Sequence, residues 1–227
     1  VIVDPDTRTA MEGLYVAGED AGGAHGSNRL GGNGVANSTV YGGVAGDVMG
    51  ADIRNMGALR DPDEAVLEAE VARALRPLSN RIAPIQPLRD KLQEAMWEDV
   101  GVMRTETGMR RGQARIADIQ AELMETGISG DNLAFNLTWH DWLNMASLCE
   151  ISEVITEAGL ARENSRGAHF REDFPESGSM ESSYFTVARQ TGAELGVSRE
   201  DVKFTIVRPG ETILPEGEPI SLVEAAE

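Results

Sequence analysis

The sequence predicts a mixed α+β fold, and three changes along the chain support this prediction. Residues 1–57 combine short apolar runs with a loop that is rich in glycine. Residues 58–170 carry apolar side chains at helical spacing and predict an antiparallel three-helix bundle. Residues 171–227 contain alternating segments and predict a small α/β tail. We therefore expect three regions with these boundaries.

The composition is that of a globular protein with an acidic surface. Its 227 residues suffice for one large or two modest domains, and 41% of them are hydrophobic. The formal net charge of −18 opposes binding to nucleic acid or to an anionic membrane surface. Because the sequence shows no apolar run long enough to cross a bilayer and no signal peptide, we expect no direct membrane insertion.

The single cysteine and the first residue are both informative. Cys149 is the only cysteine, so an internal disulfide and a cysteine-ligated cluster within this chain are excluded. Its apolar neighbours at helical spacing predict a buried, unreactive thiol. The chain opens on Val1 rather than on Met, which suggests a piece of a longer protein or a processed N-terminus. No set of histidine, cysteine and glutamate has zinc spacing, and no Ser-His-Asp order suggests a hydrolase.

The first region begins with apolar runs and ends in a helical pattern. We expect an extended segment at residues 1–3 and a turn at residues 4–6, where proline lies between two aspartates. We interpret the apolar run 14–17 as a short buried strand. The spacing over residues 35–49 favours a helix, although three glycines between 42 and 46 weaken this prediction.

A glycine-rich loop joins the apolar run to that helix. Seven of the seventeen residues from Gly18 to Gly34 are glycine. Glycine at this density permits positive φ and a close approach of backbone to a ligand. A strand, a glycine-rich turn and a helix N-terminus together favour an anion or a polar ring edge on backbone N–H groups. On spacing alone, most such loops are only turns.

The second region is predicted to consist of helices joined by short connections. A first helix starts at Asp61-Pro62 and runs to about Pro77, and a linker containing two prolines follows it. The three helices of the bundle are expected at residues 88–103, 113–125 and 139–159. Their methionine and tryptophan side chains are expected to fill the core.

The third region is expected to contain two strands. Alternation of apolar and polar side chains predicts these strands within residues 182–190 and 201–211. A short helix is expected between them, around Gly192. The pattern of this tail indicates no function.

Three segments are more specific in the order of their amino acids than in the spacing of any one residue type. They read GLYVAGEDAGGAHGSNRLGGN, LQEAMWEDVGVMRTETGM and ENSRGAHFREDFP, in this order along the chain. They resemble the flavin-contacting segment and the C-terminal helical domain of the succinate dehydrogenase/fumarate reductase flavoprotein family. The resemblance covers most of the chain up to about Pro175. It implies that residues 1–57 are the C-terminal piece of an FAD-binding domain, built from a β-hairpin, a Gly-rich loop and a helix.

The resemblance also implies a flavin site along the glycine-rich loop. Glu19 would bind the ribityl chain of FAD, the alternative being a solvated loop acid. The N–H groups of Gly34 and Val35 would face the pyrimidine edge of the flavin, where donors stabilise negative charge on the reduced ring. The residues expected to bind the cofactor or to brace its loop are Glu19, Asn28, Gly32, Asn33, Gly34 and Val35. The sequence departs from the family at Gly34, where a serine is usual, and at Asn37-Ser38 and Gly43.

Two side chains of the loop are expected to bind substrate, Arg29 and His25. A guanidinium offers a fixed fork of donors that matches a carboxylate. In the family, the arginine of the NRLGG motif binds one carboxylate of a dicarboxylate beside the flavin, and the resemblance implies this role for Arg29. The alternative for Arg29 is a surface arginine or one that pairs with phosphate. His25 titrates in the range of proton transfer, but within this motif we expect it to orient the loop.

No catalytic residue is expected within this chain. The family's G-x-G-x-x-G fingerprint, its capping domain with the arginine proton donor, and a substrate-binding histidine would all lie upstream of Val1. We therefore expect that the chain alone neither binds FAD tightly nor turns over, since the reacting groups must be fixed together. The segment at residues 163–175 is expected to pack the bundle against the flavin domain through arginine–carboxylate pairs.

The sequence thus predicts the C-terminal part of an FAD-dependent oxidoreductase that interconverts a dicarboxylate and its trans-alkene, as succinate and fumarate. The nearest alternatives are an L-aspartate oxidase-like or an adenylylsulfate reductase-like enzyme. An alternative of another class is a non-catalytic docking module for an electron-transfer partner. The expected partners are a dicarboxylate and an iron–sulfur electron-transfer subunit. The expected location is the cytoplasm, or the inner face of a membrane where a partner holds the protein there.

Overall fold

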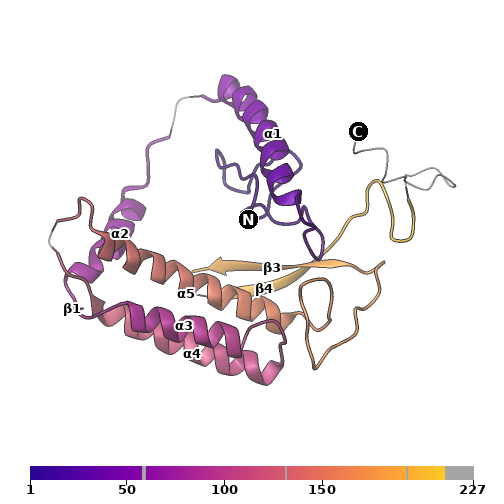
Figure 1. Cartoon of the computed structure of the whole chain (residues 1–227). Coiled ribbons are helices and arrows are strands. Elements are labelled where there is room, and N and C mark those ends of the chain that lie inside the picture. Colours follow the sequence, from indigo (N-terminus) through magenta and orange to yellow (C-terminus); the bar gives the residue numbers. More distant parts are fainter. Residues whose placement is uncertain (58–59, 131, 193, 213–227) are drawn as a thin grey trace, which may run out of the picture.

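The computed structural model describes residues 1–57, 60–130, 132–192 and 194–212. The elements are α1 (Asn33–Asn55), α2 (Glu64–Leu75), the 3-10 helix η1 (Arg76–Leu78), β1 (Arg81–Ile82), α3 (Gln86–Glu98), α4 (Glu106–Glu125), β2 (Thr126–Gly127), α5 (Leu137–Ala161), β3 (Tyr184–Thr191) and β4 (Glu194–Asp201). Figure 1 shows α3, α4 and α5 side by side, with the β3–β4 hairpin along α5. Helix α1 and the N-terminal loops lie on the other side of this hairpin. The mixed α+β fold is confirmed.

The three-helix bundle has a well-packed core, as predicted. Trp142 on α5 is fully buried, and its indole N–H donates to the carbonyls of Leu123 at 3.1 Å and Thr126 at 3.0 Å. A large aromatic side chain with its polar atom satisfied is a strong contribution to a core. Cys149 is also fully buried, and burial raises the pKa of its thiol to about 11. The core consists of Ile85, Leu88, Leu92, Ile116, Ile119, Leu123, Ile128, Trp142, Met145, Ala146 and Cys149.

The connection between α3 and α4 lies earlier in the sequence than predicted. Helix α3 ends at Glu98 rather than near Met103, and α4 begins at Glu106 rather than at Gln113. The reason is Asp99, whose side chain is 1% exposed and accepts from Arg111 at 2.7 Å and Arg115 at 3.0 Å. These bonds draw the chain back across α4 directly after α3.

Two glycines within α4, Gly108 and Gly112, allow close packing and do not end the helix. At Gly112 an added Cβ would lie 2.8 Å from Val100 Cγ2 and 3.0 Å from Asp99 Cβ. The side chain of Thr105 caps α4 by accepting from the Gly108 N–H at 3.1 Å. Gly108 and Gly112 face the α3–α4 connection, and the first two turns of α4 form ahead of residue 113, where this helix was predicted to begin.

The tail holds a β-hairpin, and two predictions about it were wrong. Strand β3 pairs antiparallel with β4, Tyr184 opposite Asp201 and Thr191 opposite Glu194. The second strand therefore lies at 194–201, and residues 202–211 hold no strand. The helix expected around Gly192 is absent, because Gly192 has a φ of +62° and turns the chain directly into β4. Of the predicted tail at residues 171–227, residues 213–227 lie outside the described residues.

The hairpin is tied to the C-terminal end of α5. Two guanidinium groups lie over the ring of Tyr184, with Arg162 Cζ 4.7 Å and Arg199 Cζ 4.9 Å from its centroid. Arg162 also donates to the Tyr184 carbonyl at 3.2 Å, and Arg199 donates to the Ala161 carbonyl at 3.3 Å. The sheet is thus fixed against the bundle on the side that faces the N-terminal loops.

The first region has its helix but not its strands. Helix α1 extends beyond the predicted 35–49 at both ends, and its three central glycines, at which an added Cβ would meet open space, do not interrupt it. The turn at 4–6 is confirmed by the Thr7 N–H, which donates to the Asp4 carbonyl at 3.0 Å. The strand predicted at 14–17 was wrong. Within the described residues this run makes one isolated bridge, Tyr15 with Arg8, and Leu14 is 45% exposed.

No helix in the described ranges combines the length and apolar character needed to cross a membrane.

Candidate functional site

The glycine-rich loop is closed at its start by the helix that follows it. The side-chain amide of Asn37, which is buried, donates to the Gly18 carbonyl at 3.2 Å. Gly18 has a φ of +97°, and a Cβ there would lie 2.9 Å from the Ser38 hydroxyl. A side chain at this position would therefore push the loop off α1. Asn37, which the sequence singled out only as a departure from the family wording, is the residue that braces the loop.

At its other end the loop leaves free N–H groups. Gly32, with a φ of +82°, directly precedes α1. The Ala36 N–H donates to the Gly32 carbonyl at 3.4 Å, and the Asn33 N–H to the Leu30 carbonyl at 3.3 Å. Among the described residues, the N–H groups of Gly34 and Val35 have no acceptor. The first turn of a helix leaves such donors unsatisfied and carries a partial positive charge, so this end of α1 is suited to an acceptor.

Arg29 lies over this helix start. Its Nη1 is 2.5 Å and its Cζ 3.2 Å from the position that a Cβ on Gly34 would take. Gly34 thus makes room for the guanidinium, and a serine at this position would displace it. Within the part of the chain that the structure describes, Arg29 has no ion-pair or hydrogen-bond partner. A guanidinium without a counter-ion and a positive helix end converge here, and an anion between them gains from both.

The other predicted residues lie along the same loop without being brought into one cluster. Glu19, Asn28 and Asn33 are exposed, and His25 is half-buried. Their side chains form no hydrogen bond within the described ranges. The structure therefore brings Arg29 together with Gly32, Gly34 and Val35 at the helix start. It leaves Glu19, His25 and the two asparagines free to meet a ligand.

The loop is held from outside by the C-terminal half of the chain. The Ala168 N–H donates to the Ser27 carbonyl at 3.2 Å. The Phe185 ring lies 3.6 Å from the position that a Cβ on Gly23 would take. Both contacts come from segments that follow the bundle in sequence. Sequence reasoning missed them, because nothing in the spacing of Gly167, Ala168 or Phe185 indicates which loop they touch.

The segment at residues 163–175 does contact the loop of the first region, but it does so through the Ala168 N–H, and its arginine–carboxylate pair binds the bundle instead. Arg171 is buried and pairs with Asp173 of its own segment, Nε to Oδ1, at 2.7 Å. It also donates to the Gly159 carbonyl at the end of α5 at 2.9 Å, while Asp173 accepts from the Glu106 N–H at the start of α4 at 2.7 Å. The pair thus satisfies one end of each helix. The Arg171 guanidinium holds the pKa of Asp173 at about 2.

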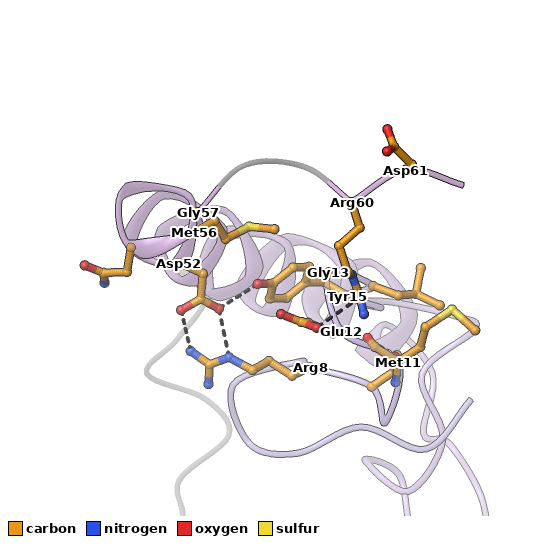
Figure 2. Close-up of a pocket in the computed structure, with 13 residues that line it drawn as sticks. Arg8, Met11, Glu12, Gly13, Tyr15, Asp52, Met56, Gly57, Arg60 and Asp61 are labelled. Atoms are coloured by element: carbon orange, nitrogen blue, oxygen red, sulfur yellow. Dashed lines mark hydrogen bonds and ion pairs between the residues drawn. The ribbon is translucent and has the colours of Figure 1, made fainter. Parts of the chain in front are cut away.

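A cavity of about 910 Å³ lies at the far end of α1, and Figure 2 shows the residues that line it. Asp52 accepts from Arg8 Nε at 2.9 Å and from the Tyr15 hydroxyl at 2.6 Å, and these bonds lower the pKa of Asp52. Arg60 pairs with Glu12 at 3.1 Å. Four of the charged groups that line this cavity, those of Arg8, Glu12, Asp52 and Arg60, are thus paired. The network around Asp52 ties α1 to the preceding turn.

A second cavity, of about 1170 Å³, lies between the N-terminal loops and the β3–β4 hairpin. Among the described residues, neither cavity is lined by any of the eight predicted site residues. Nor does any group of three histidine, cysteine, aspartate or glutamate side chains in the described ranges have the arrangement of a metal site.

Two family profiles match this chain. Residues 89–214, more than half of the chain, match the profile of the fumarate reductase flavoprotein C-terminus, and residues 1–35 match that of an FAD binding domain. The second match covers the glycine-rich loop through Val35.

Curated relatives match over most of this chain. A fumarate reductase (CoM/CoB) polypeptide of Methanothermobacter marburgensis is 33% identical over 177 residues, 78% of this chain and 32% of that protein. The fumarate reductase flavoprotein subunit of Mycobacterium tuberculosis is 32% identical over 226 residues, 94% of this chain and 38% of that protein. L-aspartate oxidase 1 of Ralstonia nicotianae is 33% identical over 179 residues, 78% of this chain and 31% of that protein. The chain spans about a third of the length of these relatives.

Solved structures share the fold. Mycobacterium smegmatis Sdh1 in complex with UQ1 superposes with a TM-score of 0.82 at 29% identity, over 89% of this chain and 35% of that chain. A quinol-fumarate reductase with menaquinol molecules superposes with a TM-score of 0.82 at 27% identity, over 91% of this chain and 37% of that chain. Adenylylsulfate reductase of Archaeoglobus fulgidus, at 16% identity and a TM-score of 0.60, shows the fold alone.

Proposed function

The chain belongs to the family of fumarate reductase flavoproteins through their C-terminal region, and we propose that it forms part of an FAD-dependent oxidoreductase acting on a dicarboxylate. The reaction is the interconversion of a saturated dicarboxylate and its alkene, of the succinate and fumarate type. The observation that carries this proposal is the guanidinium of Arg29, which lies over the N–H groups that begin α1, where neither it nor they have a partner among the described residues.

The residues at the start of α1 fit the flavin. FAD, when bound, supplies the hydride chemistry of the reaction. The N–H groups of Gly34 and Val35, which have no acceptor among the described residues, would hold the acceptor edge of its ring. The missing side chain at Gly34 leaves room for the Arg29 guanidinium beside them. The exposed carboxylate of Glu19 would accept from the hydroxyls of the ribityl chain. Asn28, Gly32 and Asn33 would complete the loop around the cofactor.

Arg29 binds the substrate in this proposal. Its fork of donors matches one carboxylate, and a lysine would supply charge without the paired geometry. His25 lies on the same loop and would contact the substrate or hold the loop that carries Arg29. The proton donor and the remainder of the flavin site would be supplied by other parts of the full-length protein.

L-aspartate oxidation is a second candidate for the full-length protein. A relative named L-aspartate oxidase 1 is 33% identical to this chain, as similar as the fumarate reductases. Aspartate is also a dicarboxylate, so Arg29 would bind it in the same way. Assays with succinate, fumarate and L-aspartate on the same preparation distinguish the two reactions.

An electron-transfer partner completes the proposal. Structural neighbours of this chain are named for quinone-linked enzymes, which supports an iron–sulfur subunit as the partner and a peripheral position at the inner face of a membrane. The chain's net charge of −18 favours contact through a partner rather than with anionic lipid.

The test uses the full-length protein that contains these residues. We would record its visible spectrum and titrate it with fumarate and succinate, then repeat both with Arg29→Ala, Arg29→Lys and the control Arg54→Ala. Arg54 is exposed on α1, so its removal changes the charge of the same element. We expect flavin in all forms, unchanged binding in the control, and binding weakened about 10- to 100-fold in Arg29→Ala, as for loss of a charge-assisted hydrogen bond.

Arg29→Lys should recover part of the binding but not all of it. Equal titrations of Arg29→Ala and Arg54→Ala would contradict the substrate role of Arg29. A wild-type protein that stays colourless after reconstitution with FAD would favour the docking module instead.

A further inference from the structure

We propose that Gly167 and Ala168 are positioning residues for Arg29, because their turn holds the loop that carries this side chain. We call this contact of the turn with Ser27 the clamp. The inference rests on the function proposed above. It adds that the region after the helical bundle sets the position of the substrate-binding side chain.

The contact is made by the tip of a tight turn. Arg166 and His169 close this turn through two backbone hydrogen bonds, of 2.8 and 3.1 Å. Gly167 has a φ of +60°, while Ala168 does not have a positive φ, which is typical of a type II′ turn. Such a turn leaves the N–H of its second central residue free to point outward. That N–H, on Ala168, donates to the Ser27 carbonyl at 3.2 Å.

Gly167 is required for this approach. A Cβ on Gly167 would overlap the Ser27 carbonyl and lie 2.8 Å from the Ser27 Cβ. Real Cβ atoms are not found this close to backbone, so a side chain would force the turn and the loop apart. The Ser27 backbone thus packs directly on the backbone of the turn, with no side chain between them.

The turn itself is fixed to the bundle. His169 Nε2 lies 3.2 Å from the Arg162 carbonyl, directly after α5. Arg166 donates to the carbonyls of Ser177 at 2.7 Å and Ser179 at 2.9 Å. Buried Arg171 follows and binds the end of α5. The position of the turn is therefore set by the end of α5 and by the segment at residues 177–179, and not by the loop that it contacts.

Ser27 transmits this position to Arg29. Only Asn28 separates the two residues, and each residue adds two soft dihedrals, so a shift of the Ser27 carbonyl moves the Arg29 backbone with it. The loop around Arg29 is largely exposed and holds no buried hydrophobic side chain in the described ranges. A misplacement of about 1 Å in a substrate-positioning group costs on the order of 100-fold in rate.

The test compares two glycine-to-alanine variants of the full-length protein. Gly167→Ala introduces a side chain at a φ of +60° against the Ser27 carbonyl. Gly192→Ala introduces one at a φ of +62° with nothing within 4 Å, so it carries the same backbone strain without the contact. A third variant, Ala168→Pro, replaces the N–H donor with a ring carbon that faces the Ser27 carbonyl, so it removes this hydrogen bond while leaving Gly167 and its positive φ unchanged. It keeps the test available if Gly167→Ala does not fold.

Two measurements are made on each variant: amide hydrogen exchange of peptides covering residues 22–31, and the KM and kcat for fumarate and succinate at constant flavin content. For Gly167→Ala and Ala168→Pro we expect faster exchange in the loop and a KM raised about 10-fold or more. Gly192→Ala should match the wild type in both measurements.

The outcomes separate the two proposals. Unchanged exchange in Gly167→Ala and Ala168→Pro overturns the clamp. Faster exchange with an unchanged KM overturns the positioning role and leaves the proposed function intact. A wild-type protein without dicarboxylate turnover overturns the proposed function and the positioning role with it, while the exchange measurement still decides whether the clamp exists.

Discussion

The bundle and the region that carries the site are built in different ways. The bundle buries Trp142, Met145 and Cys149 completely. Over residues 1–57 the structure buries one hydrophobic side chain, that of Ala45, whereas Val35 on α1 is 77% exposed. The bundle is thus stabilised by its own apolar core. The site region is held by polar contacts and by segments that follow the bundle, so its geometry depends on the rest of the chain.

The largest effect expected from this difference is the loss of a core tryptophan. Trp142→Ala should destabilise the bundle by about 3–5 kcal/mol, because it removes a buried aromatic side chain and leaves a cavity. Trp97→Ala is the matched control, since Trp97 is 73% exposed at the end of α3. We expect less than about 0.5 kcal/mol there. Urea unfolding followed by circular dichroism measures both, and equal losses would contradict the described core.

A second prediction concerns the polar network of the site region. Asp52→Asn weakens the bonds from Arg8 and Tyr15 that tie α1 to the turn before it. Hydrogen exchange should rise over residues 8–15 and 45–55, while the unfolding midpoint of the bundle stays unchanged, because the two regions share no core. Asp47→Asn, at an exposed position of the same helix, should change neither quantity. A lowered midpoint of the bundle in Asp52→Asn would show that the regions unfold as one.

A smaller, pH-dependent effect is expected where the Arg171–Asp173 pair joins the end of α5 to the start of α4. The pKa of Asp173 is held at about 2 by Arg171, below its ordinary 3.8. Because the folded-state pKa is depressed, the stabilisation is present above about pH 4 and is lost as the pH falls through 2. The free energy of unfolding of Asp173→Asn should therefore depend less on pH between 4 and 2. Asp118→Asn, at an exposed position of α4, should keep the wild-type dependence.

The sequence predicted the parts of the fold that depend on local periodicity. Apolar side chains at helical spacing placed α3, α4 and α5, since one face of each helix packs against the others. It missed the first turns of α4, because whether Gly112 breaks a helix or allows close packing depends on Val100, which no local rule identifies. It also misplaced β4, since the register of a hairpin depends on the turn at Gly192.

The site was predictable to a smaller extent. The wording around Arg29 and Glu19 indicated the loop, and the structure adds that Arg29 lies beside Gly34 at free N–H groups. The clamp on Ser27 was not predictable, because it joins backbone atoms of segments far apart in the sequence. Backbone contacts of this kind leave one sign in a sequence, a glycine such as Gly167, and glycine has many other causes.

The most direct test of the account is a crystal structure of the full-length protein with fumarate or succinate bound. We expect one carboxylate of the ligand within about 3.2 Å of the Arg29 guanidinium, beside the start of α1. We also expect the Ala168 N–H to donate still to the Ser27 carbonyl. A ligand bound elsewhere, with Arg29 facing solvent or paired with a protein carboxylate, would contradict the assignment of this loop as the dicarboxylate site.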